Sequence, residues 1–202
     1  SAKFTETTEH KKDEQGALVE FYSAPEQRLL WVNENGLTER GKAVMAEIRR
    51  ADDYGLRASD YTLPDPAGFD PNDANAVAWL ADAEVKISFA VLDYAYDARG
   101  GRIVPQKLSR NLDPTLALPT PTEVIESIAI RSDPAAYLRS FQPDQPQFEA
   151  LRQKLIALRG GKADEPEPEV IIPDGPVLKL GVEHEQVEML RRRLDVPAEP
   201  GD

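Results

Sequence analysis

Residues 70–99 read D-P-N-D-A-N-A-V-A-W-L-A-D-A-E-V-K-I-S-F-A-V-L-D-Y-A-Y-D-A-R, and this stretch decides which fold class the sequence predicts. It opens with Asp70 as a capping residue and Pro71 at a first helical position, a pair that favours a helix start. Apolar residues then recur at helical spacing as far as Arg99. They include Val77, Leu80, Ala81, Val85, Ile87, Phe89, Ala90, Val91, Leu92, Tyr94 and Ala95. A helix with so wide an apolar arc is expected at the centre of a bundle.

Shorter stretches on either side carry their own helix start and stop signals. Residues 38–54 begin with a threonine cap and are followed by Gly55, which is typical of a left-handed helix stop. Residues 120–123 read T-P-T-E, a capping box with proline in the first turn. Asp-Pro at 133–134 opens a brief helix, and residues 144–159 repeat the scheme. The sequence therefore predicts a mainly α fold, an irregular helical bundle around one long central helix.

Strand signals are weak beside these helix signals. Residues 27–32 and 170–172 are compatible with extended backbone, but neither has a clear hairpin partner. Residues 33–36, N-E-N-G, predict a turn after the first of them.

Proline placement divides the chain. Thirteen of the seventeen prolines lie from Pro105 onward, so the second half is expected to consist of short segments joined by bends. The stretch G-K-A-D-E-P-E-P-E-V-I-I-P-D-G-P-V is rich in proline, glycine and acid, as linkers are. We therefore expect a polar N-terminal tail at 1–15, a helical domain at 16–160, a linker at 161–177 and a short C-terminal helix within 178–202.

Charge argues against two classes of partner. The 202 residues include 36 acidic and 24 basic side chains, for a formal net charge of −12. Nucleic acid and anionic lipid would be repelled by such a chain. No run of about 18 apolar residues is present, so no membrane span is expected. Residues 1–15 do not form a signal-peptide pattern, and for an exported protein we expect the leader to have been removed.

Residues that could perform catalysis are scarce. The chain contains no cysteine, which removes disulfides, thiolate metal sites and a cysteine nucleophile together. Local motifs for hydrolase, zinc or nucleotide chemistry are also missing from the sequence. We therefore expect no catalytic residue, no cofactor and no metal ligand in this chain.

The two histidines and the paired acids each have a simpler interpretation than chemistry. His10 lies in a polar stretch and is expected in solvent. His184 stands between two glutamates, but sequence neighbours do not converge on a helix, so a place near a helix start is expected. The pairs 52–53 and 93/97 resemble the two carboxylates of a glycoside hydrolase, yet a chain with 36 acids contains such pairs by chance.

Three residues are candidates for a ligand or partner surface. Arg99 and Arg102 flank a glycine pair, and two guanidiniums at a flexible turn suit peptide carboxylates. The alternative is a helix stop at which these arginines cap carbonyls or pair with Asp97. Trp31, near other aromatic residues, suits a sugar platform, and its alternative role is that of a core anchor.

Three stretches together resemble a known family. They are F-Y-S-A-P-E-Q-R-L-L-W-V-N-E-N-G-L-T-E-R-G at 21–41, A-R-G-G-R-I-V-P-Q-K-L at 98–108 and L-K-L-G-V-E-H-E-Q-V-E-M-L-R-R-R-L at 178–194. In this order they are similar to the helical scaffold domain of large bacterial L,D-transpeptidases, followed by the beginning of a peptidoglycan-binding module. These enzymes cross-link peptidoglycan stems through a cysteine in a separate catalytic domain.

The resemblance implies a function without catalysis in these residues. The chain is expected to be the scaffold portion of such an enzyme, in the periplasm or cell envelope, with the catalytic domain of the same polypeptide outside it. Peptidoglycan and the proteins of cell-wall synthesis are the partners that it implies. Two alternatives remain open: a stand-alone module that binds peptidoglycan or a partner, supported by an exposed groove near the three candidate residues, and an enzyme with two acids converging in a pocket.

Overall fold

The computed structural model describes residues 2–25, 28–102, 111, 117–161 and 184–193. It divides into two compact units, Ser1–Leu155 and Ile156–Asp202, which we treat separately. The expected extended segment at 170–172 and the linker at 161–177 lie outside the described residues, except for the linker's first residue, which ends a helix.

The described residues are mainly helical, as the sequence predicts. The helices are α1 (Ala2–Ser23), α2 (Glu39–Arg49), α3 (Ala76–Ala98), α5 (Pro121–Ile130), α6 (Pro134–Arg139), α7 (Pro146–Gly161) and α8 (Glu185–Arg193). Short 3-10 segments are η1 (Ala51–Tyr54), η2 (Ala58–Asp60) and η3 (Pro66–Gly68). The described strands are β1 (Val32–Asn33) and β2 (Gly36–Leu37), which form one antiparallel pair.

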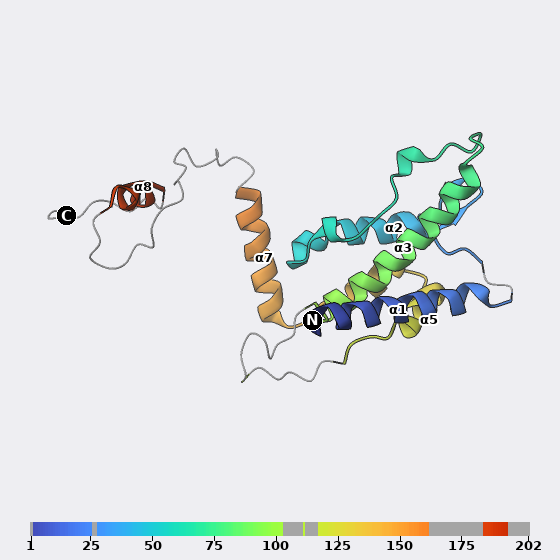
Figure 1. The fold of residues 1–202 in the computed structure, drawn as a ribbon, viewed down its shortest axis with the longest axis horizontal. Helices are drawn as coiled ribbons and strands as arrows, with labels where there is room; N and C mark the ends of the chain where they lie inside the picture. Colours follow the sequence, from blue (N-terminus) through green and yellow to red (C-terminus); the bar gives the residue numbers. More distant parts are fainter. Residues whose placement is uncertain (1, 26–27, 103–110, 112–116, 162–183, 194–202) are drawn as a thin grey trace. The chain divides into compact units, whose positions relative to one another are not determined.

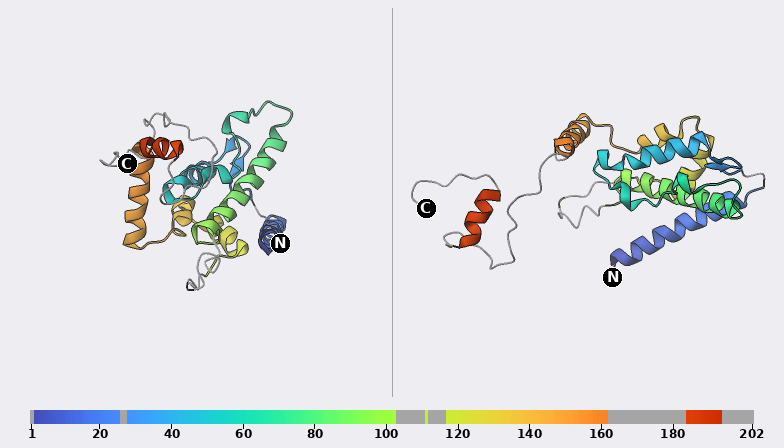
Figure 2. Two further views of the ribbon diagram at one scale, coloured as in Figure 1. Left: turned by 60° about the vertical axis from the view of Figure 1, so that its left-hand side comes forward. Right: turned by 90° about the horizontal axis from the view of Figure 1, so that it is seen from above.

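Helix α3 runs through the middle of the first unit and contacts α1, α2, α5, α6 and β1 (Figures 1 and 2). Its buried residues are Ala83, Glu84, Ile87, Ser88, Ala90, Val91, Leu92, Tyr94, Ala95 and Ala98. The prediction of a long central helix is confirmed. Ser88 is buried on this stripe as its spacing predicts, but the stripe differs in part from the expected one, because Val77 and Val85 are exposed while Glu84 faces the interior.

The first residues expected in this helix are not helical. Helix α3 begins at Ala76, six residues after the expected cap at Asp70. The Asp70 carboxylate accepts a hydrogen bond from the Asn72 backbone N–H at 2.9 Å, and that of Asp73 accepts one from Asn75 at 2.7 Å. Such aspartate turns give the backbone an alternative to the helix. Asp70 therefore stabilises a turn and does not cap the helix.

Strands β1 and β2 form a tight hairpin that leads into α2. Val32 pairs with Leu37 and Asn33 with Gly36, whose φ of 101° belongs to the left-handed region that favours glycine. The predicted turn at 33–36 is thus confirmed. The Thr38 side chain then caps α2 by accepting a hydrogen bond from the Gly41 N–H.

Helix α2 and the 3-10 segment η1 together replace the single helix expected at 38–54. Regular α-helix ends at Arg49, and η1 continues as far as Tyr54. The helical segment then ends at Gly55, whose φ of 79° is left-handed, as the sequence predicts.

Helices α5 and α6 start where their capping signals predict. The Thr120 and Glu123 side chains form the reciprocal capping box of α5, and the Asp133 side chain accepts the Ala136 N–H at the start of α6. A part-buried ion pair links α6 to α2, because Arg139 Nη1 lies 2.7 Å from Oε2 of the buried Glu47. Nothing in the sequence pattern had indicated that pair.

The N-terminal tail expected at 1–15 is part of a helix in the structure. Residues from Ala2 to Ser23 form α1 without a break at residue 15, and α1 packs on α5 and α3. Ala17 and Leu18 are buried on its inner side. A polar composition had suggested a solvated tail, but a helix needs only a narrow buried stripe to dock.

Candidate functional site

A buried carboxylate on α3 holds the segment that enters the hairpin. Glu84 is 2% exposed. Its Oε1 accepts the Leu30 N–H at 2.6 Å, and its Oε2 accepts the N–H groups of Trp31 at 2.9 Å and Val32 at 3.1 Å. Charge-assisted hydrogen bonds of this kind offset the cost of burying the carboxylate. They fix an irregular backbone segment to the central helix.

Two hydroxyl groups extend this contact. The Tyr22 hydroxyl donates to Glu84 Oε1 at 2.7 Å and lies 2.9 Å from Ser88 Oγ, while the Trp31 indole N–H donates to Ser88 Oγ at 2.9 Å. Burial, with the Glu84 charge nearby, raises the pKa of Tyr22, so its hydroxyl stays protonated and serves as a donor. We call Tyr22, Glu84 and Ser88 the anchor network.

Trp31 belongs to the core. Its side chain has no exposed surface and its indole N–H is bonded within the anchor network. The structure therefore gives Trp31 the role of core anchor, and its ring is not available as a sugar platform on the surface.

Arg102 is exposed, and its guanidinium group is paired with two carboxylates of the same chain. Its Nη2 pairs with Asp60 Oδ2, and its Nη1 lies 3.6 Å from Asp97 Oδ2. Arg99 Nε donates to the Ala117 carbonyl at 3.4 Å. These contacts follow the helix-stop alternative, in which the arginines bind carbonyls and Asp97. The structure does not bring Arg99 and Arg102 together with buried Trp31 on one exposed surface.

The paired acids that resemble hydrolase carboxylates face different partners. Asp93 pairs with Lys11, whereas the Asp97 carboxylate accepts the Tyr61 hydroxyl at 3.0 Å. Asp53 pairs with Arg50 on the outside of η1, at 3.2 Å. The Asp93 and Asp97 carboxylates therefore bind different partners.

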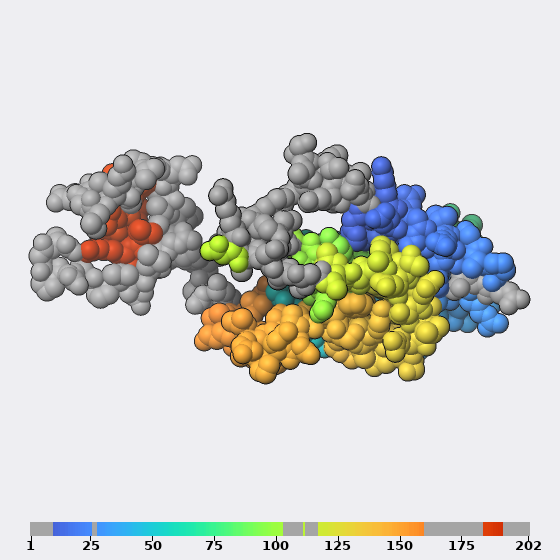
Figure 3. Space-filling view, turned by 90° about the horizontal axis from the view of Figure 1, so that it is seen from below, coloured from blue at the N-terminus to red at the C-terminus, as the bar shows by residue number. Residues whose placement is uncertain are grey.

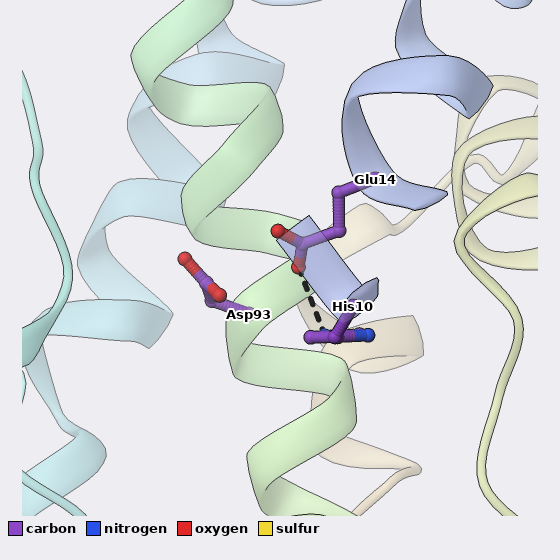
Figure 4. Close-up of side chains that lie close together, drawn as sticks. All are labelled: His10, Glu14 and Asp93. Carbon is purple, nitrogen blue, oxygen red and sulfur yellow. Dashed lines mark ion pairs between the residues drawn. The ribbon is translucent and has the colours of Figure 1, made fainter. Parts of the chain in front are cut away.

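A different group of ionisable side chains does converge, between α1 and α3. Figure 4 shows His10 and Glu14 on α1 facing Asp93 on α3. His10 Nε2 lies 3.1 Å from Glu14 Oε1, and Lys11 Nζ lies 3.0 Å from Glu14 Oε2 and 2.5 Å from Asp93 Oδ1. We call His10, Lys11, Glu14 and Asp93 the α1–α3 charged cluster.

Burial shifts the proton affinities in this cluster. The Glu14 side chain has no exposed surface, and burial together with the nearby Asp93 charge raises the pKa of Glu14 to about 7. Burial lowers the pKa of His10, which favours a neutral imidazole. The His10 ring also stacks on Tyr96, with centroids 3.9 Å apart. The expectation that His10 is solvated is therefore wrong.

Sequence reasoning missed this cluster for an identifiable reason. Spacing of four residues places His10 and Glu14 on one helix face, but that signal has meaning only if the tail is helical. Asp93 joins them only because α1 packs on α3, a contact between residues more than 80 positions apart.

An apolar groove lies between α1 and α5, whose surfaces adjoin in Figure 3. Its volume is about 420 Å³. It is lined by Ala17, Glu20, Phe21, Ala24, Thr122, Ile125, Glu126, Ala129 and Ile130. Ile130 is 85% exposed, and Glu20 and Glu126 add negative charge to the lining. The groove suits binding of a side chain more than catalysis, because apolar groups with two exposed acids dominate it.

Fold and contacts together define the class of this protein. It is an all-α bundle whose buried polar groups hold its own backbone in place. Helix α1 contributes to both the groove and the charged cluster. In the comparison with protein families, residues 16–155 match the family described as Scaffold domain. That match covers more than half of the 202 residues, and the chain belongs to the Scaffold domain family.

Two further comparisons found no match. Neither the curated proteins nor the solved structures contain a match to this chain. Among the described helices, none combines the length and the apolar character needed to cross a membrane.

Proposed function

We propose that this chain is the non-catalytic scaffold portion of a peptidoglycan L,D-transpeptidase that takes part in cell-wall cross-linking. The observation that carries the proposal is the Scaffold domain match at 16–155, which includes the stretch at 21–41 that resembles the scaffold of these enzymes. The proposed location is the periplasm or cell envelope. Peptidoglycan and cell-wall synthesis proteins are the proposed partners.

The chemistry of the reaction supports a division of labour. Acyl transfer of this kind uses a thiolate that attacks a stem-peptide carbonyl and then passes the acyl group to an amine. The chain has no cysteine, so the nucleophile would lie in another domain of the same polypeptide. A bundle braced by the anchor network and by capped helices is suited to holding such a domain in a set orientation.

Carbapenem labelling tests the proposal. Carbapenems acylate the cysteine of these transpeptidases, so we expect no added mass on the 202-residue chain after incubation. The polypeptide encoded by the uninterrupted reading frame should gain one carbapenem mass, on a cysteine. An adduct on the 202-residue chain, or a complete reading frame that encodes no cysteine-bearing domain, would contradict the proposal.

A second candidate function is a binding module for a partner protein, which the α1–α5 groove favours. Its apolar floor and its two glutamates suit a partner segment that carries an apolar side chain beside lysine or arginine. A net charge of −12 adds attraction for a basic segment.

Photo-cross-linking in the producing cell separates the second candidate from the first. A photoreactive residue at Ala129, inside the groove, should cross-link to a peptide that contains both basic and apolar residues. The matched control is Val77, which is 78% exposed and lies on α3 away from the groove lining. Equal labelling at both positions, or a cross-linked peptide without basic residues, would reject the groove as a partner site.

A further inference from the structure

We propose that His10, Glu14 and Asp93 form a binding site for a divalent transition-metal ion, with Zn²⁺ the best fit, for which the Lys11 ammonium group competes. This inference does not depend on the proposed function. It assigns a ligand to a set of buried polar atoms that the anchor network and the groove do not use.

The geometry already approaches that of a three-ligand site. One ligand atom from each of the three side chains lies within 4.8 Å of the others. Zinc binds imidazole nitrogen and carboxylate oxygen at about 2.0–2.2 Å, which places neighbouring ligand atoms of a tetrahedral site roughly 3.3–3.5 Å apart. His10 Nε2 and Glu14 Oε1 are 3.1 Å apart, so only a small movement would complete this edge of the tetrahedron.

The buried atoms of the cluster lack hydrogen bonds of good geometry. Neither Glu14 oxygen accepts a hydrogen bond of good geometry, and His10 Nε2 has no such partner, although all three atoms are buried. Ion-pair contacts with Lys11 and within the cluster are what offsets the Glu14 charge. Buried polar atoms in this condition are costly, and a bound cation is one of the arrangements that satisfies them.

The donor types favour zinc. An imidazole binds zinc as its neutral form and a carboxylate binds it as its ionised form. The Tyr96 ring fixes the orientation of the imidazole by stacking on it. One nitrogen and two carboxylates match zinc, whereas magnesium prefers oxygen ligands and keeps its water shell.

Lys11 gives the proposal a signature that a purely structural cluster would lack. Its ammonium group now sits between Glu14 and Asp93, and its side chain is 47% exposed. A bound ion would repel this ammonium group, which can turn outward to solvent on its flexible stem. The substitution Lys11→Gln should therefore tighten zinc binding, while loss of a ligand should weaken it.

Zinc titration of the untagged 202-residue chain at pH 7.5 tests the inference, with calorimetry or a competing zinc indicator as the readout. We expect one zinc per chain, with Kd raised about ten-fold or more by His10→Ala and by Asp93→Asn. Lys11→Gln should lower Kd several-fold. Lys12→Gln, an exposed neighbour on α1, and His184→Ala, which removes the other histidine, should leave Kd unchanged.

Circular dichroism shows whether each variant remains folded. If His10→Ala or Asp93→Asn unfolds, Lys11→Gln still tests the inference, because Lys11 is half-exposed and its replacement removes no ligand. Absence of one-to-one zinc binding in both the wild type and Lys11→Gln would overturn the inference. Equal Kd values for the wild type, His10→Ala and Lys11→Gln would overturn it as well, because the bound zinc would then lie elsewhere.

Discussion

Glu84 illustrates how much of this fold depends on single buried side chains. Its carboxylate accepts four hydrogen bonds: the backbone N–H groups of Leu30, Trp31 and Val32, and the Tyr22 hydroxyl. These donors come from α1 and from the segment that enters the hairpin. A single buried glutamate on the central helix therefore supplies the acceptors for three backbone N–H groups that would otherwise be buried without a partner.

We expect Glu84→Gln to lower the free energy of unfolding by about 2–4 kcal/mol. The amide keeps one accepting oxygen but presents an NH₂ group to N–H donors, so at least one backbone donor loses its partner. Denaturant titration followed by tryptophan fluorescence gives the value. Asp82→Asn, an exposed change two residues away on the same helix, should stay within about 0.5 kcal/mol of wild type. Equal effects of the two changes would show that the anchor network does not stabilise the fold.

Residue-scale roles were the hardest part to predict. The spacing of residues in α3 had placed Val77 and Val85 on the buried stripe, yet both are exposed and Glu84 is inside. Periodicity weighs a residue by its hydrophobicity alone, whereas the burial of Glu84 depends on hydrogen-bond donors more than fifty residues away in the sequence. The prediction that His10 lies in solvent is wrong for the same reason, because the groups that His10 meets on α3 lie more than 80 residues away in the sequence.

At the scale of elements, helix boundaries follow local chemistry where a cap has no competing bond. The capping signals of α2, α5 and α6 predict the observed helix starts, because a threonine or aspartate side chain there accepts an N–H group of the first turn. The predicted first helical residue of α3, Pro71, precedes the observed one, Ala76, by five residues, since Asp70 bonds its own turn instead. Packing between elements also limits which residue fits at position 41, where α2 lies against the Trp31 backbone.

Two glycine substitutions in helices should have opposite effects. A Cβ atom at Gly41 in α2 would lie 2.4 Å from the Trp31 carbonyl oxygen, whereas one at Gly16 in α1 would meet nothing within 4 Å. Gly41→Ala should therefore lower the free energy of unfolding by about 2 kcal/mol or more, despite the better helix propensity of alanine. Gly16→Ala should raise it by up to about 1 kcal/mol.

Thermal and chemical denaturation of the two variants beside wild type provide the measurement. Stabilisation by both substitutions would mean that α2 does not pack as closely against the Trp31 backbone as the structure shows. Destabilisation by Gly16→Ala would mean that residue 16 is not in the middle of an exposed helix face.

For the whole molecule, one continuous core joins elements from both ends of the first unit. Buried residues from α1, β1, α2, α3, α5 and α6 belong to a single cluster. A shared core of this kind favours cooperative unfolding, because no element can leave without exposing its neighbours.

Aromatic probes allow this cooperativity to be measured. Both tryptophans and all six tyrosines lie between residues 22 and 137, inside the first unit. We expect tryptophan fluorescence and near-UV circular dichroism to give the same denaturation midpoint. Ile125 in α5 has no exposed surface, so Ile125→Ala should lower the free energy of unfolding by about 2–5 kcal/mol. Both midpoints should fall by the same amount. Midpoints that separate in either protein would show that part of the bundle unfolds independently.

The sequence alone determined the helical class, the long central helix within residues 70–99, the turn at 33–36 and several capped starts. Each of these depends on neighbours within one or two turns, which periodicity and capping rules can detect. Tertiary structure alone decided that α1 docks and that His10, Glu14 and Asp93 meet. It also selected between the two roles that the sequence left open for Trp31 and for Arg102, in favour of the core anchor and the paired arginine. Those outcomes need contacts between residues far apart in the chain, and no local pattern specifies which distant donor or charge a side chain will face.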